Sequence, residues 1–133
     1  MILFIDDQAL LTKPIRDILI DIGGYNVLYA MSYDEAQITI KLNIDKIKLV
    51  LIDIMMPAEE GHPPDDKFGL STGLRLGQWV KQLLPDVPIF ALTVRDDIST
   101  DELKTAGIEE IFVKPVNPQE LLTKIEEYLG SQT

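Results

Sequence analysis

Short apolar segments alternate with longer amphipathic segments along the chain. Each apolar segment spans four or five positions and is rich in β-branched residues, which is typical of strands buried on both faces of a sheet. Because an amphipathic stretch follows each one, the pattern predicts βα units. The predicted fold class is α/β and doubly wound, with a five-stranded parallel sheet and five helices on both of its faces. The predicted strands are Ile2 to Ile5, Asn26 to Ala30, Lys48 to Ile52, Pro88 to Leu92 and Glu110 to Val113.

Capping residues mark several helix starts. Ser32, followed three positions later by a glutamate, matches the capping box in which a serine accepts from the first turn. Asn117 before Pro118 is another start, because proline is favoured at the first helical position. The first helix, about 8–22, contains Pro14, which predicts a kink or a loosened first turn. The apolar stripes of the second, third and fifth helices are predicted at Ala36, Ile40 and Ile44, at Leu76, Val80 and Leu83, and at Leu121, Ile125 and Tyr128 or Leu129.

Composition and charge narrow the function classes. The chain has 133 residues, with 22 acidic against 12 basic side chains, a net charge of −10 and no cysteine. This length fits a single domain over 1–133 that needs no disulfide to fold. The acidic excess argues against direct nucleic-acid binding, since a phosphate footprint needs clustered Lys and Arg. No apolar run approaches the ~20 residues of a membrane span, so we expect no membrane contact and a cytoplasmic location.

One polar segment, Ala58 to Leu70, interrupts the alternation. It contains His62, a proline pair and several acids, and it is longer than the ~2 to 6 residues of an ordinary βα connection. It is interpreted either as a loop that covers a site or contacts a partner, or as a solvated insertion without a role. Base rates favour the insertion, and His62 is interpreted as a surface residue.

Three carboxylates follow predicted strands. Asp6 and Asp7 come directly after the first strand, and Asp53 comes after the third. Because the carboxyl ends of parallel strands share one edge of the sheet, these groups are predicted to lie together and to repel one another unless a cation binds. Carboxylates with open coordination positions suit Mg²⁺. Asp7 alone is more typical of a turn or a helix cap, but the three together favour a metal site.

A hydroxyl and an ammonium are predicted at the same edge. Thr93 follows the fourth strand, and Lys114 follows the fifth. They supply a hydrogen-bond donor and a positive charge for a phosphoryl group. Each residue alone is commonplace, whereas together with the carboxylates they predict a phosphoryl-transfer site.

The motifs around these residues resemble the receiver domain of bacterial two-component response regulators. They are FIDD ending at Asp7, LIDIMMP around Asp53, ALT ending at Thr93 and FVKP around Lys114. Five motif positions recur in order on the expected strands, and the resemblance covers nearly the whole chain. It implies a flavodoxin-like sheet with strand order 2-1-3-4-5.

The resemblance also implies a role for each residue. Asp53 would accept a phosphoryl group from a sensor histidine kinase or a phosphotransfer protein, with Mg²⁺ as cofactor. Lys114 would pair with the phosphoryl group and Thr93 would hydrogen-bond it, shifting the domain between two conformations. A cis peptide bond before Pro115 is implied as well. The implied Mg²⁺ ligands are the carboxylates of Asp6, Asp7 and Asp53 and the backbone carbonyl of Met55.

The sequence departs from the family pattern at three places. The family usually has an aromatic residue three positions before the lysine, but Ile111 stands there, and strand alternation turns the neighbouring Phe112 towards the core. Val94 follows Thr93 where the family favours a very small residue, which predicts altered phosphorylation or dephosphorylation rates. Thr93, Val94 and Ile111 form the predicted switch region. The segment 58–70 is the third departure.

Three functions compete. The leading hypothesis is a signalling switch that is no enzyme beyond catalysing its own phosphorylation and dephosphorylation. Phosphorylation would change the surface of the fourth helix, fifth strand and fifth helix, which would bind an unidentified downstream protein or a second copy. The alternatives are a phosphorylation-independent interaction module and a haloacid-dehalogenase-like phosphatase, which needs a second Asp where Met55 stands. The fifth helix is predicted to end near Leu129, so we expect a stand-alone receiver or one excised from a longer protein.

Overall fold

Strands and helices alternate through the chain as the hydrophobic pattern predicts. The computed structural model describes residues 1–53, 70–93 and 100–130. Within these ranges the elements are β1 (Ile2–Ile5), α1 (Ala9–Asp21), β2 (Val27–Ala30), α2 (Tyr33–Leu42), β3 (Leu49–Asp53), α3 (Leu70–Leu83), β4 (Ile89–Thr93), α4 (Thr100–Thr105), β5 (Glu110–Val113) and α5 (Pro118–Leu129). The predicted loop at 58–70 lies outside the described residues, except that Leu70 begins α3.

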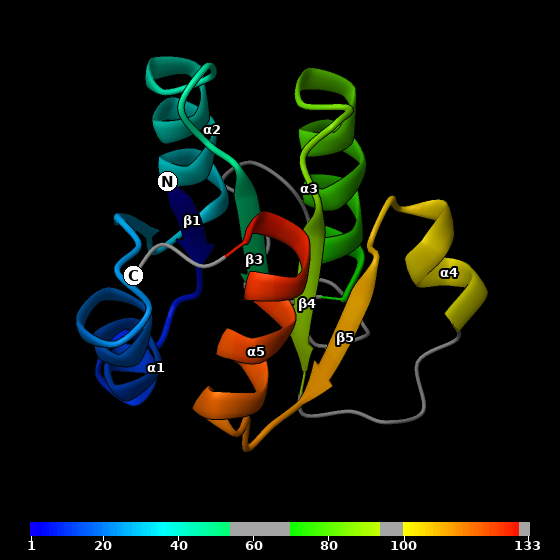
Figure 1. The fold of residues 1–133 in the computed structure, drawn as a ribbon. Helices are drawn as coiled ribbons and strands as arrows, with labels where there is room; N and C mark the ends of the chain where they lie inside the picture. Colours follow the sequence, from blue (N-terminus) through cyan, green and yellow to red (C-terminus); the bar gives the residue numbers. More distant parts are fainter. Residues whose placement is uncertain (54–69, 94–99, 131–133) are drawn as a thin grey trace.

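The described strands form one parallel sheet in the order β2-β1-β3-β4-β5. This confirms the predicted fold class, including the strand order that the family resemblance implied. Figure 1 shows α1 and α5 on one face of the sheet and α2 and α3 on the other. None of the helices in the described part of the chain is long and apolar enough to cross a bilayer.

Successive side chains of a strand point to opposite faces of the sheet, so each face carries its own hydrophobic core. Leu3 and Ile5 belong to the cluster between the sheet and α2, α3 and α4, whereas Ile2 and Phe4 belong to the cluster under α1 and α5. All four are fully buried, because a central strand of a doubly wound sheet has helices on both sides.

Two strands lie one residue further along the chain than predicted, which places a polar residue at the end of each. β3 includes Asp53 and β4 includes Thr93, where strands ending one residue earlier were expected. Asp53 pairs with Leu92, and Thr93 pairs with Val113. The backbone at both residues is therefore held by the sheet, which limits how far their side chains can move.

Side-chain caps begin α2 and α5, as predicted. The Ser32 hydroxyl accepts from the Glu35 amide at 3.1 Å, while the Glu35 carboxylate accepts from the Met31 amide at 3.0 Å. Asn117 Oδ1 accepts from two backbone amides of the first turn of α5. Each cap satisfies donors that a helix start leaves without intrahelical partners.

Pro14 does not end α1, which continues from Ala9 to Asp21. At its start the Gln8 carbonyl accepts from both the Leu11 and Thr12 amides, at 3.0 and 3.1 Å. The first turn therefore includes a tighter i to i+3 contact. The expected kink at Pro14 stays a prediction.

Two predicted helix stripes are wrong at their last position. Ile44 lies beyond the end of α2 and is 40% exposed, because the helix stops at Leu42. Leu84, not Leu83, completes the buried stripe below Val80, since a spacing of four residues keeps the same face of a helix.

Candidate functional site

Three carboxylates meet at the carboxyl ends of β1 and β3. Asp6, Asp7 and Asp53 each offer one carboxylate oxygen, and these oxygens all lie within 4.8 Å of one another. Asp6 is fully buried, Asp53 is 4% exposed, and Asp7 is half-buried. The structure thus brings together the three acids whose position after strands predicted a common edge.

Hydrogen bonds hold both the backbone and the side chain of Asp6. Its amide donates to the Ala30 carbonyl at 3.0 Å, and its Oδ1 accepts from the Gln8 amide at 2.7 Å. The Tyr29 hydroxyl donates to its backbone carbonyl. These contacts fix one carboxylate oxygen and leave Oδ2 directed towards the other charged groups of the site.

Lys114 lies between two of the acids. Its Nζ is 3.3 Å from Asp6 Oδ2 and 3.3 Å from Asp53 Oδ2, with 18% of its side chain exposed. The ammonium offsets one of the three negative charges, so the cluster still attracts a cation. The peptide bond between Lys114 and Pro115 is cis, as the resemblance implied.

Thr93 is fully buried at the end of β4, next to β3 in the sheet. Its carbonyl accepts from the Lys114 amide at 2.6 Å, which links the ends of β4 and β5. Val94 and Met55, the other residues predicted at this edge, lie outside the described part of the chain.

The neighbours at positions 111 and 112 face opposite sides of β5. Ile111 is 38% exposed, whereas Phe112 is half-buried and packs against the core under α5, with its ring 5.8 Å from that of Phe90. This confirms the prediction that Phe112 turns towards the core. An aromatic side chain therefore does not stand at the exposed position of this strand.

The donor set fits Mg²⁺. Carboxylate oxygens are hard ligands, and opposite ligands of an octahedral Mg²⁺ lie about 4 Å apart. The 4.8 Å spread of the three carboxylate oxygens is only slightly larger, so small side-chain movements let them converge on one ion. Asp6, Asp7 and Asp53 are therefore the residues that could hold it.

Two residues beside the site did not emerge from the sequence. Tyr29 lies in β2 next to β1, and its ring has the Arg16 guanidinium 4.3 Å from its centroid. The adjacency of β1 and β2 brings Tyr29 near Asp6. The sequence offered one signal for Tyr29: it is a polar aromatic residue one position before the end of the strand that lies beside β1.

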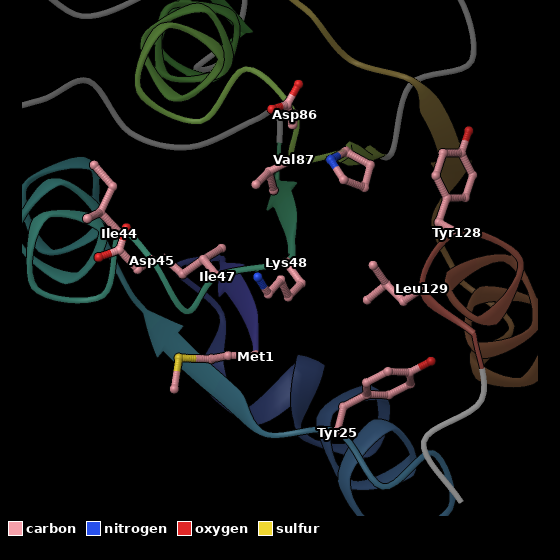
Figure 2. Close-up of a pocket in the computed structure, with 11 residues that line it drawn as sticks. Met1, Tyr25, Ile44, Asp45, Ile47, Lys48, Asp86, Val87, Tyr128 and Leu129 are labelled. Carbon is pink, nitrogen blue, oxygen red and sulfur yellow. The ribbon is translucent and has the colours of Figure 1, made fainter.

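Two pockets lie at opposite ends of the sheet. The smaller, about 440 Å³, is largely apolar and adjoins Lys114 and the start of α1. The larger, about 700 Å³, is drawn in Figure 2. It is lined from the segments before β3 and β4 and from the end of α5, for example by Lys48, Asp86 and Leu129. These segments precede β3 and β4, so the larger pocket lies away from the acidic cluster.

Comparisons with known proteins agree with this geometry. Residues 2–126 match the response regulator receiver domain family. The transcriptional regulatory protein YvrH of Bacillus subtilis is 32% identical over 130 residues, which cover 96% of this chain and 48% of that protein. CpxR of Klebsiella pneumoniae is also 32% identical, over 132 residues, with 96% and 48% covered. The chain thus spans about half the length of these relatives.

Solved structures show the same likeness. The CheY-like receiver domain from Methanospirillum hungatei has a TM-score of 0.75 and 28% identity, covering 96% of this chain and 91% of that one. A response regulator from Chloroflexus aurantiacus has a TM-score of 0.75 and 27% identity, covering 96% and 95%. With the family match over residues 2–126, the chain belongs to the response regulator receiver domains of two-component signalling.

Proposed function

We propose that this receiver is a phosphoaccepting switch and that Asp53 is its phosphoacceptor. The observation that carries the proposal is the placement of Lys114 Nζ 3.3 Å from both Asp53 and Asp6, within the acidic cluster. A nucleophilic carboxylate, its counter-charge and a set of cation ligands therefore meet at one sheet edge, as phosphoryl transfer requires.

The proposed donor is a phosphohistidine of a sensor histidine kinase or a phosphotransfer protein. A carboxylate oxygen of Asp53 attacks the phosphorus atom, the P–N bond to the donor imidazole breaks, and the imidazole leaves with its electron pair and takes up a proton. The product is an aspartyl phosphate. Bound Mg²⁺ would neutralise charge on the transferring group.

The protein's own residues provide the positioning. Sheet pairing at Asp53 and Thr93 fixes the backbone at two adjacent strand ends. Lys114 is proposed to move from the carboxylates to a phosphoryl oxygen, and the Thr93 hydroxyl is proposed to donate to the same group. A change at Thr93 reaches β5 through the bond between its carbonyl and the Lys114 amide.

We propose the α4–β5–α5 surface as the output of this switch. Ile111 and Val113 are 38% and 46% exposed on β5, the edge strand of the described sheet. Exposed apolar residues on an edge strand suit contact with a downstream protein or a second copy of the chain.

One observation favours a second candidate, a phosphorylation-independent interaction module. Ile111 occupies the exposed position where the family usually has an aromatic, and Phe112 packs against the core. The same surface would then bind its partner without a phosphorylation signal.

Intact-mass measurement separates the two candidates. Wild type is incubated with Mg²⁺ and a small acyl phosphate, beside Asp53→Asn and the control Asp86→Asn, which changes an exposed acid before β4. We expect one phosphoryl group on wild type and on the control, and none on Asp53→Asn. Equal labelling of all three, or none on a wild type that binds Mg²⁺, would contradict the proposal.

A further inference from the structure

The backbone carbonyl of Asp6 lies just beyond the sheet. Pairing of β1 with both neighbours ends at Ile5, which pairs with Ala30 of β2 and Ile52 of β3. Asp6 is fully buried, so its carbonyl requires a hydrogen-bond donor. The Tyr29 hydroxyl supplies that donor.

Two side chains pack against the Tyr29 ring. Its centroid is 6.1 Å from that of Phe4 on β1, and the Arg16 guanidinium of α1 lies 4.3 Å from it. Tyr29 is half-buried, and packing between an aromatic ring and a cation restricts its rotation. The hydroxyl is therefore directed at the Asp6 carbonyl by contacts from two other elements.

The hydroxyl keeps its proton at neutral pH. Burial raises the pKa of Tyr29, and the carboxylates of Asp6 and Asp7 raise it further. A hydrogen bond with Thr12 and the charge of Arg16 lower this pKa in part. The Tyr29 hydroxyl can therefore donate to the Asp6 carbonyl at neutral pH.

We propose that Tyr29, oriented by Arg16, is a positioning residue for the cation-binding carboxylate of Asp6. The Asp6 amide donates to the Ala30 carbonyl, and the Asp6 carbonyl accepts from Tyr29, so the backbone is fixed on both sides of the side chain. With Oδ1 bonded to the Gln8 amide, Oδ2 is the oxygen presented to a cation. The inference rests on the proposed function, because it assigns Asp6 to a Mg²⁺ site.

The test measures Mg²⁺ binding directly, by calorimetric titration without any phosphoryl donor. Tyr29→Phe removes only the hydroxyl and keeps the ring on Phe4 and Arg16. Supporting partners of metal ligands typically contribute ~10-fold or more in affinity, so we expect Tyr29→Phe to weaken Mg²⁺ binding about 10-fold. Saturating Mg²⁺ should then restore its phosphorylation rate.

Tyr25→Phe is the matched control. The Tyr25 hydroxyl also donates to a backbone carbonyl, that of Gly130 at 2.8 Å, and its side chain lines the pocket away from the acidic cluster. Its loss should leave the Mg²⁺ affinity unchanged. Equal Mg²⁺ affinity of Tyr29→Phe and wild type would overturn the inference, as would equal weakening by both variants.

Arg16→Lys provides a second readout that keeps both the hydroxyl and the positive charge. It removes the planar guanidinium over the ring, and we expect weaker Mg²⁺ binding with the metal-free protein still folded by circular dichroism. If Tyr29→Phe does not fold, unchanged affinity in Arg16→Lys overturns the inference and weaker affinity supports it. A folded wild type that fails to bind Mg²⁺ overturns the proposed function and this inference together. A wild type that binds Mg²⁺ as tightly as Tyr29→Phe overturns this inference alone.

Discussion

Three like charges share a small volume at the site, with one ammonium between two of them. Asp6 and Asp53 are buried, Lys114 contacts both, and the negative charge of Asp7 adds to theirs. Like charges this close disfavour the metal-free folded state. The arrangement therefore suits cation binding better than it suits stability.

Asp7→Asn should show this conflict directly. Removing one like charge should raise the free energy of unfolding of the metal-free protein by about 1 kcal/mol. Because Asp7 is one of the proposed ligands, Mg²⁺ affinity should fall by at least the ~10-fold typical of a lost supporting partner. Thermal denaturation in a chelator and calorimetric titration measure the two effects.

An exposed acid outside the cluster is the control. Asp45→Asn should change neither the metal-free stability nor the Mg²⁺ affinity appreciably. If Asp7→Asn instead lowers the stability of the metal-free protein, the contacts that Asp7 makes outweigh the repulsion within the cluster.

At the scale of residues, a site residue could be placed from the sequence where its position at the end of a strand was sufficient information. The placement of Asp6, Asp53 and Lys114 at one edge follows from their positions at strand ends in a parallel sheet. Tyr29 and Arg16 were missed. The resemblance already placed β2 beside β1, but the contact of Arg16 with the Tyr29 ring depends on how α1 is rotated against the sheet, which hydrophobic periodicity does not determine.

At the scale of elements, strand ends and caps decide where the site residues lie. The cap at Asn117 begins α5 three residues after Lys114 and directly before Pro118. Asn117 Oδ1 accepts from the Gln119 amide at 2.9 Å and from the Glu120 amide at 3.3 Å. This cap fixes the turn that joins the site to α5.

Asn117→Ala should lower the free energy of unfolding by about 1 kcal/mol, since it removes an acceptor for two amides. Asn117→Asp keeps an acceptor and should recover most of the loss. Denaturant titration of the three proteins measures this. Equal destabilisation by Ala and Asp would show that the cap bonds contribute little.

Element boundaries were predictable to within about a residue for the strands, because burial on both faces gives continuous apolar runs. Helix ends were less predictable. Ile44 continued the spacing of the second helix, but Asn43 is the C-cap and ends the periodic face. The spacing of apolar residues in the sequence does not show at which residue the helix ends.

At the scale of the whole molecule, the α1–α5 layer supports the site from one face of the sheet. Gly23, in the turn after α1, is buried. A Cβ added there would lie 2.7 Å from Leu122 Cδ1 and 2.7 Å from the Leu19 carbonyl oxygen. The Leu122 side chain can move aside but the Leu19 backbone carbonyl cannot, so the turn after α1 favours glycine at this position.

Gly23→Ala should destabilise the protein by about 1–3 kcal/mol through overpacking. Gly130→Ala is the contrast, because nothing lies within 4 Å of its added Cβ and only its φ of +78° disfavours the change. It should cost about 1–3 kcal/mol through backbone strain alone. No loss of stability in Gly23→Ala, by thermal denaturation, would contradict the packing argument.

The α/β class and the two-sided sheet were predictable from the hydrophobic pattern, whereas the strand order came from the family resemblance. Periodicity assigns each strand two buried faces but does not assign its neighbours. The order β2-β1-β3-β4-β5 places β1 between β2 and β3, and this adjacency brings Asp6, Asp53 and Tyr29 together.

The most direct test of the proposed switch is to locate the phosphoryl group. Wild type is treated with Mg²⁺ and a small acyl phosphate donor. The aspartyl phosphate formed on the protein is then reduced with borohydride, and the peptides are mapped by mass spectrometry. We expect the reduced residue at Asp53 alone, with labelling abolished by a chelator. Modification at Asp6, Asp7 or another residue, or labelling independent of Mg²⁺, would contradict the assignment of Asp53 as the phosphoacceptor.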